Sequence, residues 1–351
     1  MCIRDSLRVI KDEARRLGDW ESLALALDVE LHLRHTMGDL RAIPPLFESM
    51  REVVRRGSKI AGALAHSGLA VQILFGDEPM AALAHGRRAV QDCDPASEHR
   101  LRVLLRLLLV LQYGGKFYSS EAARIVEEAR SVAKTSGDLL LRFSLESNIA
   151  VAHLDSGNLD AAEVAMERST AMLGSAELDM NRFNQAINAG ELALATRDFE
   201  RAQSSFHSAQ RFIGPKIPVY SESMVLAGLG LCALGTGDLA TARAMENSLP
   251  DDPERWYFDP TLLTMFRCRM HGYRGEPGRA LKLLEDVTAA IEGRLVLAWL
   301  KLTLFRADME RRYNESQAAD LAFRGLEVAK SLGLADRGRQ FSELLRGLNV
   351  A

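Results

Sequence analysis

Small residues recur along this chain at a nearly fixed interval. Five alanines stand forty residues apart, and two more follow at intervals of thirty-eight: Ala82, Ala122, Ala162, Ala202, Ala242, Ala280 and Ala318. A small or apolar residue comes seven positions after each of them: Ala89, Ala129, Ser169, Ala209, Leu249, Val287 and Gly325. A fixed period in this range is typical of one supersecondary unit repeated along a solenoid.

A short turn signal precedes the anchor alanines. Its copies are Gly38-Asp39-Leu40, Gly76-Asp77-Glu78, Gly157-Asn158-Leu159, Arg197-Asp198-Phe199, Gly237-Asp238-Leu239 and Gly275-Glu276-Pro277. Glycine ends a helix because it adopts the left-handed conformation without a Cβ clash. The Asp or Asn that follows can cap the next helix by accepting backbone N–H bonds. Each copy therefore predicts a helix, a tight turn and a second helix.

The stretches on the two sides of each turn differ in pattern. An apolar segment of about four turns precedes the turn, and an amphipathic segment with small residues at helical spacing follows it. The apolar segments include residues 21–36, 100–113, 142–155 and 294–311. The second helices are expected to end at Pro95, Pro215 and Pro253, or at Gly18-Asp19 and Gly137-Asp138. No long alternating Val/Ile/Thr run appears, so we expect an all-α fold.

This pattern resembles the tetratricopeptide repeat (TPR). The second-helix signature of that family stands intact as Ala202, Phe206 and Ala209, and it recurs loosely as Ala122, Val126, Ala129 and as Ile43, Phe47, Met50. The period is longer than the usual ~34 residues. The chain is therefore most similar to the degenerate arrays of large bacterial regulators such as MalT-like activators. HEAT and armadillo repeats share the period but lack the Gly-Asp-Leu-x-x-Ala turn. The resemblance implies a right-handed α-solenoid of about eight TPR-like helix-turn-helix repeats.

The repeat overrides the two globular domains that length alone would suggest. We expect one array over residues 7–351, with residues 334–351 as a C-terminal capping helix. Residues 1–6 are interpreted as a non-native leader. Residues 7–17 look like a second helix that lacks its first, so further sequence is expected upstream.

Composition excludes several classes of function. The 44 basic and 47 acidic residues nearly balance, and aromatic residues make up 6%, which argues against direct nucleic-acid binding by this segment. The most apolar run, residues 101–111, is shorter than the ~20 residues that a membrane span needs. The four cysteines form no C-x-x-C pair. Together these features predict a cytoplasmic protein with reduced thiols.

No catalytic, cofactor or metal site is expected. His32, His35 and His66 fall on neighbouring first helices and could in principle bind a metal, but a solvated polar patch is the alternative interpretation. Gly228, Gly230 and Gly235 do not form a nucleotide-binding fingerprint, and close helix packing explains them better.

The TPR resemblance implies that first helices line a concave binding surface. Counting back from each turn nominates twelve residues: Asp28, His32, His35, His66, Arg102, Arg106, Gln112, Ser147, Asn148, Asn184, Asn188 and Glu191. At least one of Arg102 and Arg106 should reach the groove or pair with a neighbour, because an unpaired buried charge is costly. Glu127 and Glu128 are expected on the outer face.

The predicted function is non-catalytic: a protein-interaction or ligand-sensing scaffold, forming the C-terminal part of a bacterial signalling or transcription regulator. The alternative is a free-standing TPR adaptor that docks a partner peptide. An enzyme is disfavoured because the sequence offers no site. The expected partner is a protein or peptide, with a small-molecule effector as the second class.

Overall fold

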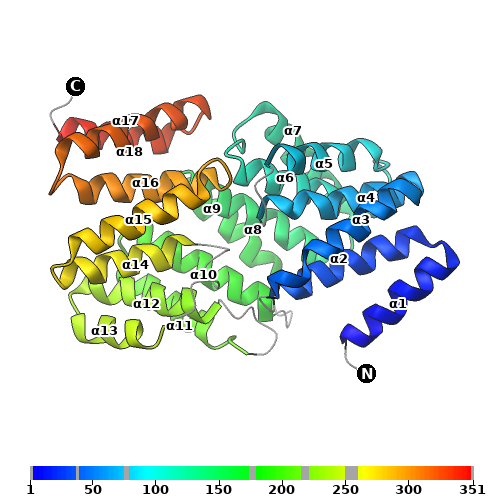
Figure 1. Ribbon diagram of the computed structural model, residues 1–351, viewed down its shortest axis with the longest axis horizontal. Helices are drawn as coiled ribbons and strands as arrows, with labels where there is room; N and C mark the ends of the chain where they lie inside the picture. Colours follow the sequence, from blue (N-terminus) through cyan, green and yellow to red (C-terminus); the bar gives the residue numbers. More distant parts are fainter. Residues whose placement is uncertain are drawn as a thin grey trace. The chain divides into compact units, whose positions relative to one another are not determined.

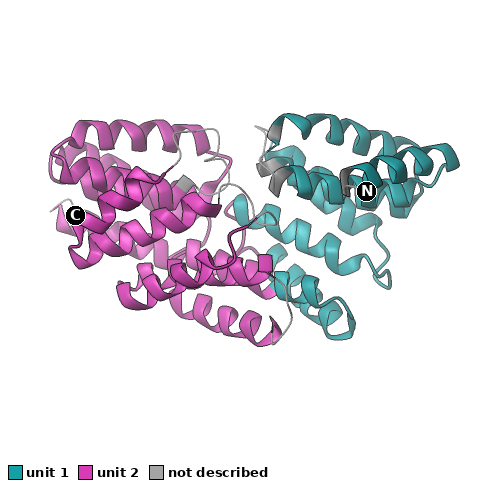
Figure 2. Cartoon of the chain, turned by 90° about the horizontal axis from the view of Figure 1, so that it is seen from below, with its two compact units in different colours: residues 1–113, 120–145 teal, residues 114–119, 146–351 magenta. Residues whose placement is uncertain are grey.

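The computed structural model describes residues 3–36, 39–74, 79–173, 179–214, 221–249 and 260–348. The described residues form 18 α-helices and two short 3-10 helices, with no β-strand among them (Figure 1). The predicted turn residues Gly38 and Gly76-Asp77-Glu78, and the predicted helix ends at Pro215 and Pro253, lie outside these ranges. The chain divides into two compact units: residues 1–113 with 120–145, and residues 114–119 with 146–351 (Figure 2).

Unit 1 is built from the helices of the N-terminal part of the chain. They are α1 (Ile3–Leu17), α2 (Trp20–Thr36), η1 (Leu40–Ala42), α3 (Pro44–Arg56), α4 (Lys59–Ala70), η2 (Val71–Leu74), α5 (Pro79–Asp92), α6 (Arg100–Tyr113), α7 (Ser120–Thr135) and the start of α8 (Leu139–Asp155).

Unit 2 contains the end of α8 and the remaining helices. They are α9 (Leu159–Leu173), α10 (Asp179–Ala195), α11 (Phe199–Gln210), α12 (Ser221–Thr236), α13 (Leu239–Asn247), α14 (Pro260–Tyr273), α15 (Pro277–Ile291), α16 (Val296–Glu310), α17 (Glu315–Ser331) and α18 (Ala335–Gly347).

Helices that are adjacent in the sequence pack against each other, and successive even-numbered helices also contact one another. In unit 1, α2 contacts α4 and α4 contacts α6; in unit 2, α10, α12, α14, α16 and α18 form the same succession. Within each unit the even-numbered helices are therefore the first helices of the repeats and form a layer, and the odd-numbered helices pack on their even-numbered neighbours. Eight pairs, from α2–α3 to α16–α17, lie in the described residues, which confirms the predicted helical-repeat fold.

The turns have the predicted chemistry. Gly157 has a φ of 83° and Gly237 one of 82°. In the first turn the Asn158 N–H donates to the His153 carbonyl at 2.9 Å, and the Gly157 N–H donates to the Leu154 carbonyl at 3.0 Å. This is the Schellman pattern, which satisfies the last carbonyls of a helix. The Asn158 side-chain oxygen then accepts from the Ala161 N–H at 3.2 Å and caps α9.

The second turn of this kind places a non-glycine residue in the left-handed region. Arg197, forty residues from both Gly157 and Gly237, has a φ of 62° and is the one non-glycine residue with positive φ among those described. Its N–H donates to the Leu194 carbonyl at 3.1 Å, as in the glycine copies. The left-handed conformation costs an L-residue about 1–2 kcal/mol, so this turn carries backbone strain that its neighbours avoid.

The periodic small residues form the contact between paired helices. All seven anchor alanines are 0% exposed. The partners seven residues later are buried as well, except that in α15 the half-buried Val287 gives way to the buried Thr288. In α7 the bulky buried position is Ile125 and not Val126, which is only half-buried. The helical register therefore differs by one residue from the sequence assignment at these two positions.

Phenylalanine rings occupy the spaces that glycines leave on the first helices. An ideal Cβ on Gly228 would lie 2.5 Å from the Phe206 ring, and one on Gly190 would lie 2.7 Å from the same ring. Cβ atoms on Gly230 and Gly235 would each come within 2.3 Å of a ring, of Phe266 and Phe199 respectively. Close helix packing, as predicted, is the reason for the glycine-rich sequence of α12.

The first and last described segments are helices. α1 begins at Ile3, so residues 3–6 continue the helix that the sequence assigns to residues 7–17. Leu7 and Ala14 are buried, and α1 contacts α2, whereas Val9, Ile10 and Leu17 are exposed. α18 falls within the predicted capping segment 334–351.

In the part of the chain that is described, no helix has the length and apolarity needed to cross a membrane.

Candidate binding cleft

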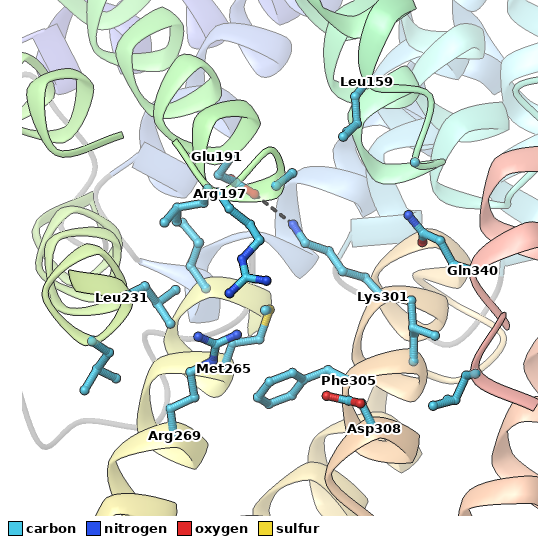
Figure 3. Close-up of a pocket in the computed structure, with 18 of the residues that line it drawn as sticks. Leu159, Glu191, Arg197, Leu231, Met265, Arg269, Lys301, Phe305, Asp308 and Gln340 are labelled. Atoms are coloured by element: carbon cyan, nitrogen blue, oxygen red, sulfur yellow. Dashed lines mark hydrogen bonds and ion pairs between the residues drawn. The ribbon is translucent and has the colours of Figure 1, made fainter. Parts of the chain in front are cut away.

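Unit 2 contains a cleft of about 920 Å³ along its layer of first helices. Its walls come from the ends of α8 and α10, from α12, α14, α16 and α18, and from the first residues of α9 and α11. Apolar side chains such as Leu231, Met265 and Phe305 share this surface with charged ones (Figure 3). A cleft of this size with apolar walls and a few polar groups is typical of a ligand-binding site.

An ion pair joins two distant helices across the cleft. The Lys301 ammonium of α16 donates to a carboxylate oxygen of Glu191 on α10 at 2.8 Å, as the dashed line in Figure 3 marks. Lys301 also lies 4.0 Å from the Asp155 carboxylate at the end of α8. Glu191 is only 8% exposed, and an unpaired carboxylate would be costly to bury there. The ion pair with Lys301 offsets that cost.

α18 is tied to the end of α8 by a buried arginine. Arg337 donates to the Asp155 carbonyl at 2.5 Å and to the Gln340 side-chain oxygen at 2.6 Å. Burial lowers the pKa of Arg337 to about 10, although the Asp155 carboxylate acts in the opposite direction. The contact joins residues 182 positions apart and, like the Lys301 pair, connects helices that line the cleft but are far apart in the sequence.

Three other arginines at the cleft make no ion pair with any described residue. They are Arg197 at the α10–α11 turn, Arg269 on α14 and Arg312 after α16, and each of them remains partly exposed to solvent. The Arg269 guanidinium lies 5.7 Å from the centre of the Phe305 ring. In Figure 3 the guanidinium groups of Arg197 and Arg269 point toward one another at one wall. Partial burial lowers the pKa of Arg269, and the positive charge of Arg197 lowers it further.

All twelve residues nominated by the sequence lie on even-numbered helices, as their assignment to first helices requires. Among the described side chains of this set, Glu191 is the member that lines the unit 2 cleft. Ser147 and Asn188 come together, and the Asn188 amide donates to the Ser147 hydroxyl at 3.4 Å. Asn184 is exposed and Asn148 half-buried.

The nominated residues of unit 1 form a separate polar cluster. Asp28 on α2 is buried and accepts from Arg102 at 3.1 Å and from Arg106 at 3.0 Å, both on α6. Burial alone would raise the pKa of Asp28, but the two guanidinium groups outweigh it and lower that pKa. Both arginines therefore pair with a neighbour, which satisfies the sequence expectation. Arg102 also lines a hollow of about 670 Å³ in unit 1.

The other nominated residues of unit 1 with described side chains are His32, His66 and Gln112. His32 lies near the Asp28 cluster, and partial burial and Arg106 lower its pKa. The His66 and His85 Nδ1 atoms lie 2.8 Å apart, and burial together with the charge of His85 lowers the pKa of His66 to about 4. Gln112 is buried. His35 lies in α2, and its side chain is outside the described ones. No group of three or more His, Cys, Asp or Glu side chains able to hold a metal was found among the described residues.

One assignment on the outer face is wrong. Glu127 is exposed as expected, but Glu128 pairs with Arg100, which is 6% exposed. Arg100 also donates to the carbonyls of Val90 and Cys93 at 2.6 and 2.9 Å, at the end of α5. Glu128 is thus paired with a buried arginine of its own helix pair, and that arginine also contacts the end of the preceding pair.

Sequence reasoning missed most of the cleft residues, although a usable signal was present. Glu191, Leu231 and Arg269 each stand six positions before a left-handed turn residue, and each lines the cleft. That register would have found Arg269. No comparable signal marks Lys301 or Arg337, because their partners come from helices far away in the sequence.

No protein-family model and no curated protein matches this sequence. Among solved structures, the fold is similar to that of a Rap protein complexed with competence and sporulation factor, with a TM-score of 0.68 and 15% sequence identity. The similarity covers 94% of this chain and 93% of the Rap chain, and at this identity it establishes a shared helical-repeat fold.

Proposed function

We propose that this protein is a non-catalytic binding scaffold and that the cleft of unit 2 holds a peptide. The observation that carries the proposal is the cleft itself: about 920 Å³, lined by successive first helices with apolar side chains between charged ones. Apolar walls suit peptide side chains, and the charged groups suit its polar backbone and termini.

Two further observations support a peptide ligand. The fold is similar to that of a protein that was crystallised with a competence and sporulation factor. The Lys301–Glu191 and Arg337–Asp155 contacts also form the cleft before any ligand arrives, which reduces the cost of binding. Glu191 belongs to this cleft, and we propose that Ser147, Asn148, Asn184 and Asn188 extend its polar surface. A small-molecule effector is the second class of ligand for the same cleft.

The nominated residues of unit 1 form a second candidate surface: Asp28, His32, His35, His66, Arg102, Arg106 and Gln112. The cellular role that fits such a scaffold is sensing within a bacterial signalling or transcription regulator of the MalT-like kind, in the cytoplasm. A free-standing adaptor is the alternative. An in-frame nucleotide-binding or DNA-binding domain upstream in the genome would favour the regulator.

Affinity selection tests the peptide proposal. The purified chain is mixed with a soluble library of N-terminally labelled random heptapeptides, and retained peptides are identified by mass spectrometry. The affinity of a selected peptide is then measured by fluorescence anisotropy. Phe305→Ala, in the cleft, should weaken binding about tenfold or more, because aromatic anchors commonly dominate binding energy.

Phe323→Ala is the matched control, since Phe323 is 45% exposed on α17, outside the cleft. It should leave the affinity unchanged. The proposal fails if no peptide is retained, or if the two variants weaken binding equally.

A further inference from the structure

The basic side chains of the unit 2 cleft outnumber the acidic ones. Six basic and three acidic residues line it: Arg197, Arg269, Lys301, Arg311, Arg312 and Arg337 against Glu191, Asp308 and Glu343. Lys301 pairs with Glu191, and Arg311 pairs with Asp308 at 3.1 Å. The buried Arg337 donates from its two Nη atoms to a carbonyl and an amide oxygen, and the Asp155 carboxylate acts on its charge. The exposed positive charge that has no ion-pair partner among the described residues is therefore that of Arg197, Arg269 and Arg312.

Arg197 occupies its position at a cost in backbone energy. Its φ of 62° is the conformation that Gly157 and Gly237 adopt in the equivalent turns, where glycine incurs no Cβ clash. A glycine would complete the same Schellman turn with less strain. Strained residues of this kind cluster at ligand sites, where the side chain has a use that offsets the strain. Here the side chain carries a guanidinium group into the cleft (Figure 3).

Arg269 faces Arg197 from α14, which is separated from α10 by one first helix, α12 (Figure 3). Its guanidinium is held near the Phe305 ring at 5.7 Å, which fixes its direction without neutralising its charge. Each of the two charges raises the free energy of the other, and partial burial in the cleft strengthens that repulsion. An anion between the two guanidinium groups would remove the repulsion and would accept hydrogen bonds from both.

We propose that Arg197 and Arg269 together form a receptor for one carboxylate group of the ligand in the cleft. The identification of the ligand as a peptide rests on the proposed function. The binding of a carboxylate by the arginine pair is independent of that proposal. Arginine binds carboxylates through N–H···O bonds in the plane of its guanidinium group, and a carboxylate has two oxygens that can accept from both arginines.

A carboxylate matches this site better than a phosphate. Asp308, although it pairs with Arg311, also acts electrostatically on Arg269, so negative charge already lies near the pair. That charge would repel a phosphate dianion more strongly than a carboxylate monoanion. The apolar side chains of Leu231 and Met265 nearby also favour an organic acid over an inorganic anion.

The first experiment uses small probes and needs no peptide. Thermal shifts are measured with N-acetyl-leucine, with its neutral isostere N-acetyl-leucinamide and with inorganic phosphate, at constant chloride. N-acetyl-leucine should raise the Tm of the wild-type protein in a saturable manner, and N-acetyl-leucinamide should not. The effect should disappear in Arg269→Gln and in Arg197→Gly. Arg197→Gly is the safer variant for folding, because it relieves the strained turn.

Arg279→Gln is the matched control: Arg279 is exposed on α15 and pairs only with the nearby Glu276 among the described residues. Its response to N-acetyl-leucine should equal that of the wild type. An equal response in all four proteins, no response in any, or a larger shift with phosphate than with N-acetyl-leucine would overturn the carboxylate assignment.

The second experiment identifies the source of the carboxylate. Each peptide selected for the cleft is remade with a C-terminal amide, and separately with its Asp and Glu residues replaced by Asn and Gln. One of the two changes should weaken binding about tenfold or more, the size expected for losing a charge-assisted hydrogen-bonded pair, and should weaken it much less in Arg269→Gln. Sensitivity to amidation identifies the C-terminus, and sensitivity to Asn or Gln identifies a side chain.

The two proposals fail separately. Peptides that bind equally well in all three forms would refute the carboxylate receptor and leave the peptide cleft intact. A response to N-acetyl-leucine that depends on Arg269, combined with no peptide binding, would refute the peptide proposal and support the carboxylate receptor.

Discussion

Replacing Gly228 by Ala should destabilise unit 2 even though alanine favours helices. The added Cβ would lie 2.5 Å from the Phe206 ring, a separation that real Cβ atoms do not adopt. The ring cannot move away freely, because it is 0% exposed and it also packs against α10, where a Cβ on Gly190 would be only 2.7 Å from it. Overpacking of this kind costs about 1–3 kcal/mol. An approach of 2.5 Å to a fully buried ring belongs to the upper part of this range, about 2–3 kcal/mol. The better helix propensity of alanine returns about 1 kcal/mol, so a net loss of about 1–2 kcal/mol is expected.

Urea unfolding followed by circular dichroism measures this loss. Gly272→Ala, on α14, is the control: a Cβ there would meet nothing within 4 Å, so the variant should be neutral or slightly stabilised. Phe206→Leu should be destabilising alone by about 1–3 kcal/mol because it leaves a cavity. Combined with Gly228→Ala, it should cost at least about 0.5 kcal/mol less than the sum. A neutral Gly228→Ala variant, or strict additivity in the double variant, would refute the packing argument.

Three other predictions concern the turns, the helix pairs and the charged cluster of unit 1. Gly157→Val should cost more than about 1 kcal/mol by thermal melting, because Gly157 has a φ of 83°. Ala202→Trp should cost about 1–3 kcal/mol and reduce hydrogen-exchange protection mainly in residues 180–240, since Ala202 is 0% exposed. The lowered pKa of Asp28 means that its contribution to stability is complete above its unfolded pKa of about 4 and is lost as the pH falls through the lower folded value. Asp28→Asn should therefore be less stable at pH 7 and lose less stability on acidification than the wild type, which acid titration of the circular dichroism signal would show.

Local and periodic features of the sequence were sufficient to predict the fold. The forty-residue spacing, the Gly-Asp or Gly-Asn turns and the small residues at Ala202 and Ala209 depend on contacts within one helix pair. Those contacts join residues that are close in the sequence, and the same residue types recur in each repeat. Each copy of the pattern therefore supports the interpretation of the others. The two register differences, at Val126 and Val287, arise where apolar residues adjoin and periodicity cannot choose between them.

The binding cleft was predictable only as a layer of first helices. Glu191 was found because it lies on that layer at a fixed distance from a turn, but its partner Lys301 lies 110 residues away and no local pattern links the two. The same holds for Arg337, whose hydrogen bond to the Asp155 carbonyl depends on how the last helix meets the end of α8. Arg197 stood in the sequence as one imperfect copy of a glycine turn. Its strained backbone and its approach to Arg269 became visible only in the tertiary structure, because the repeats set which side chains meet across the cleft.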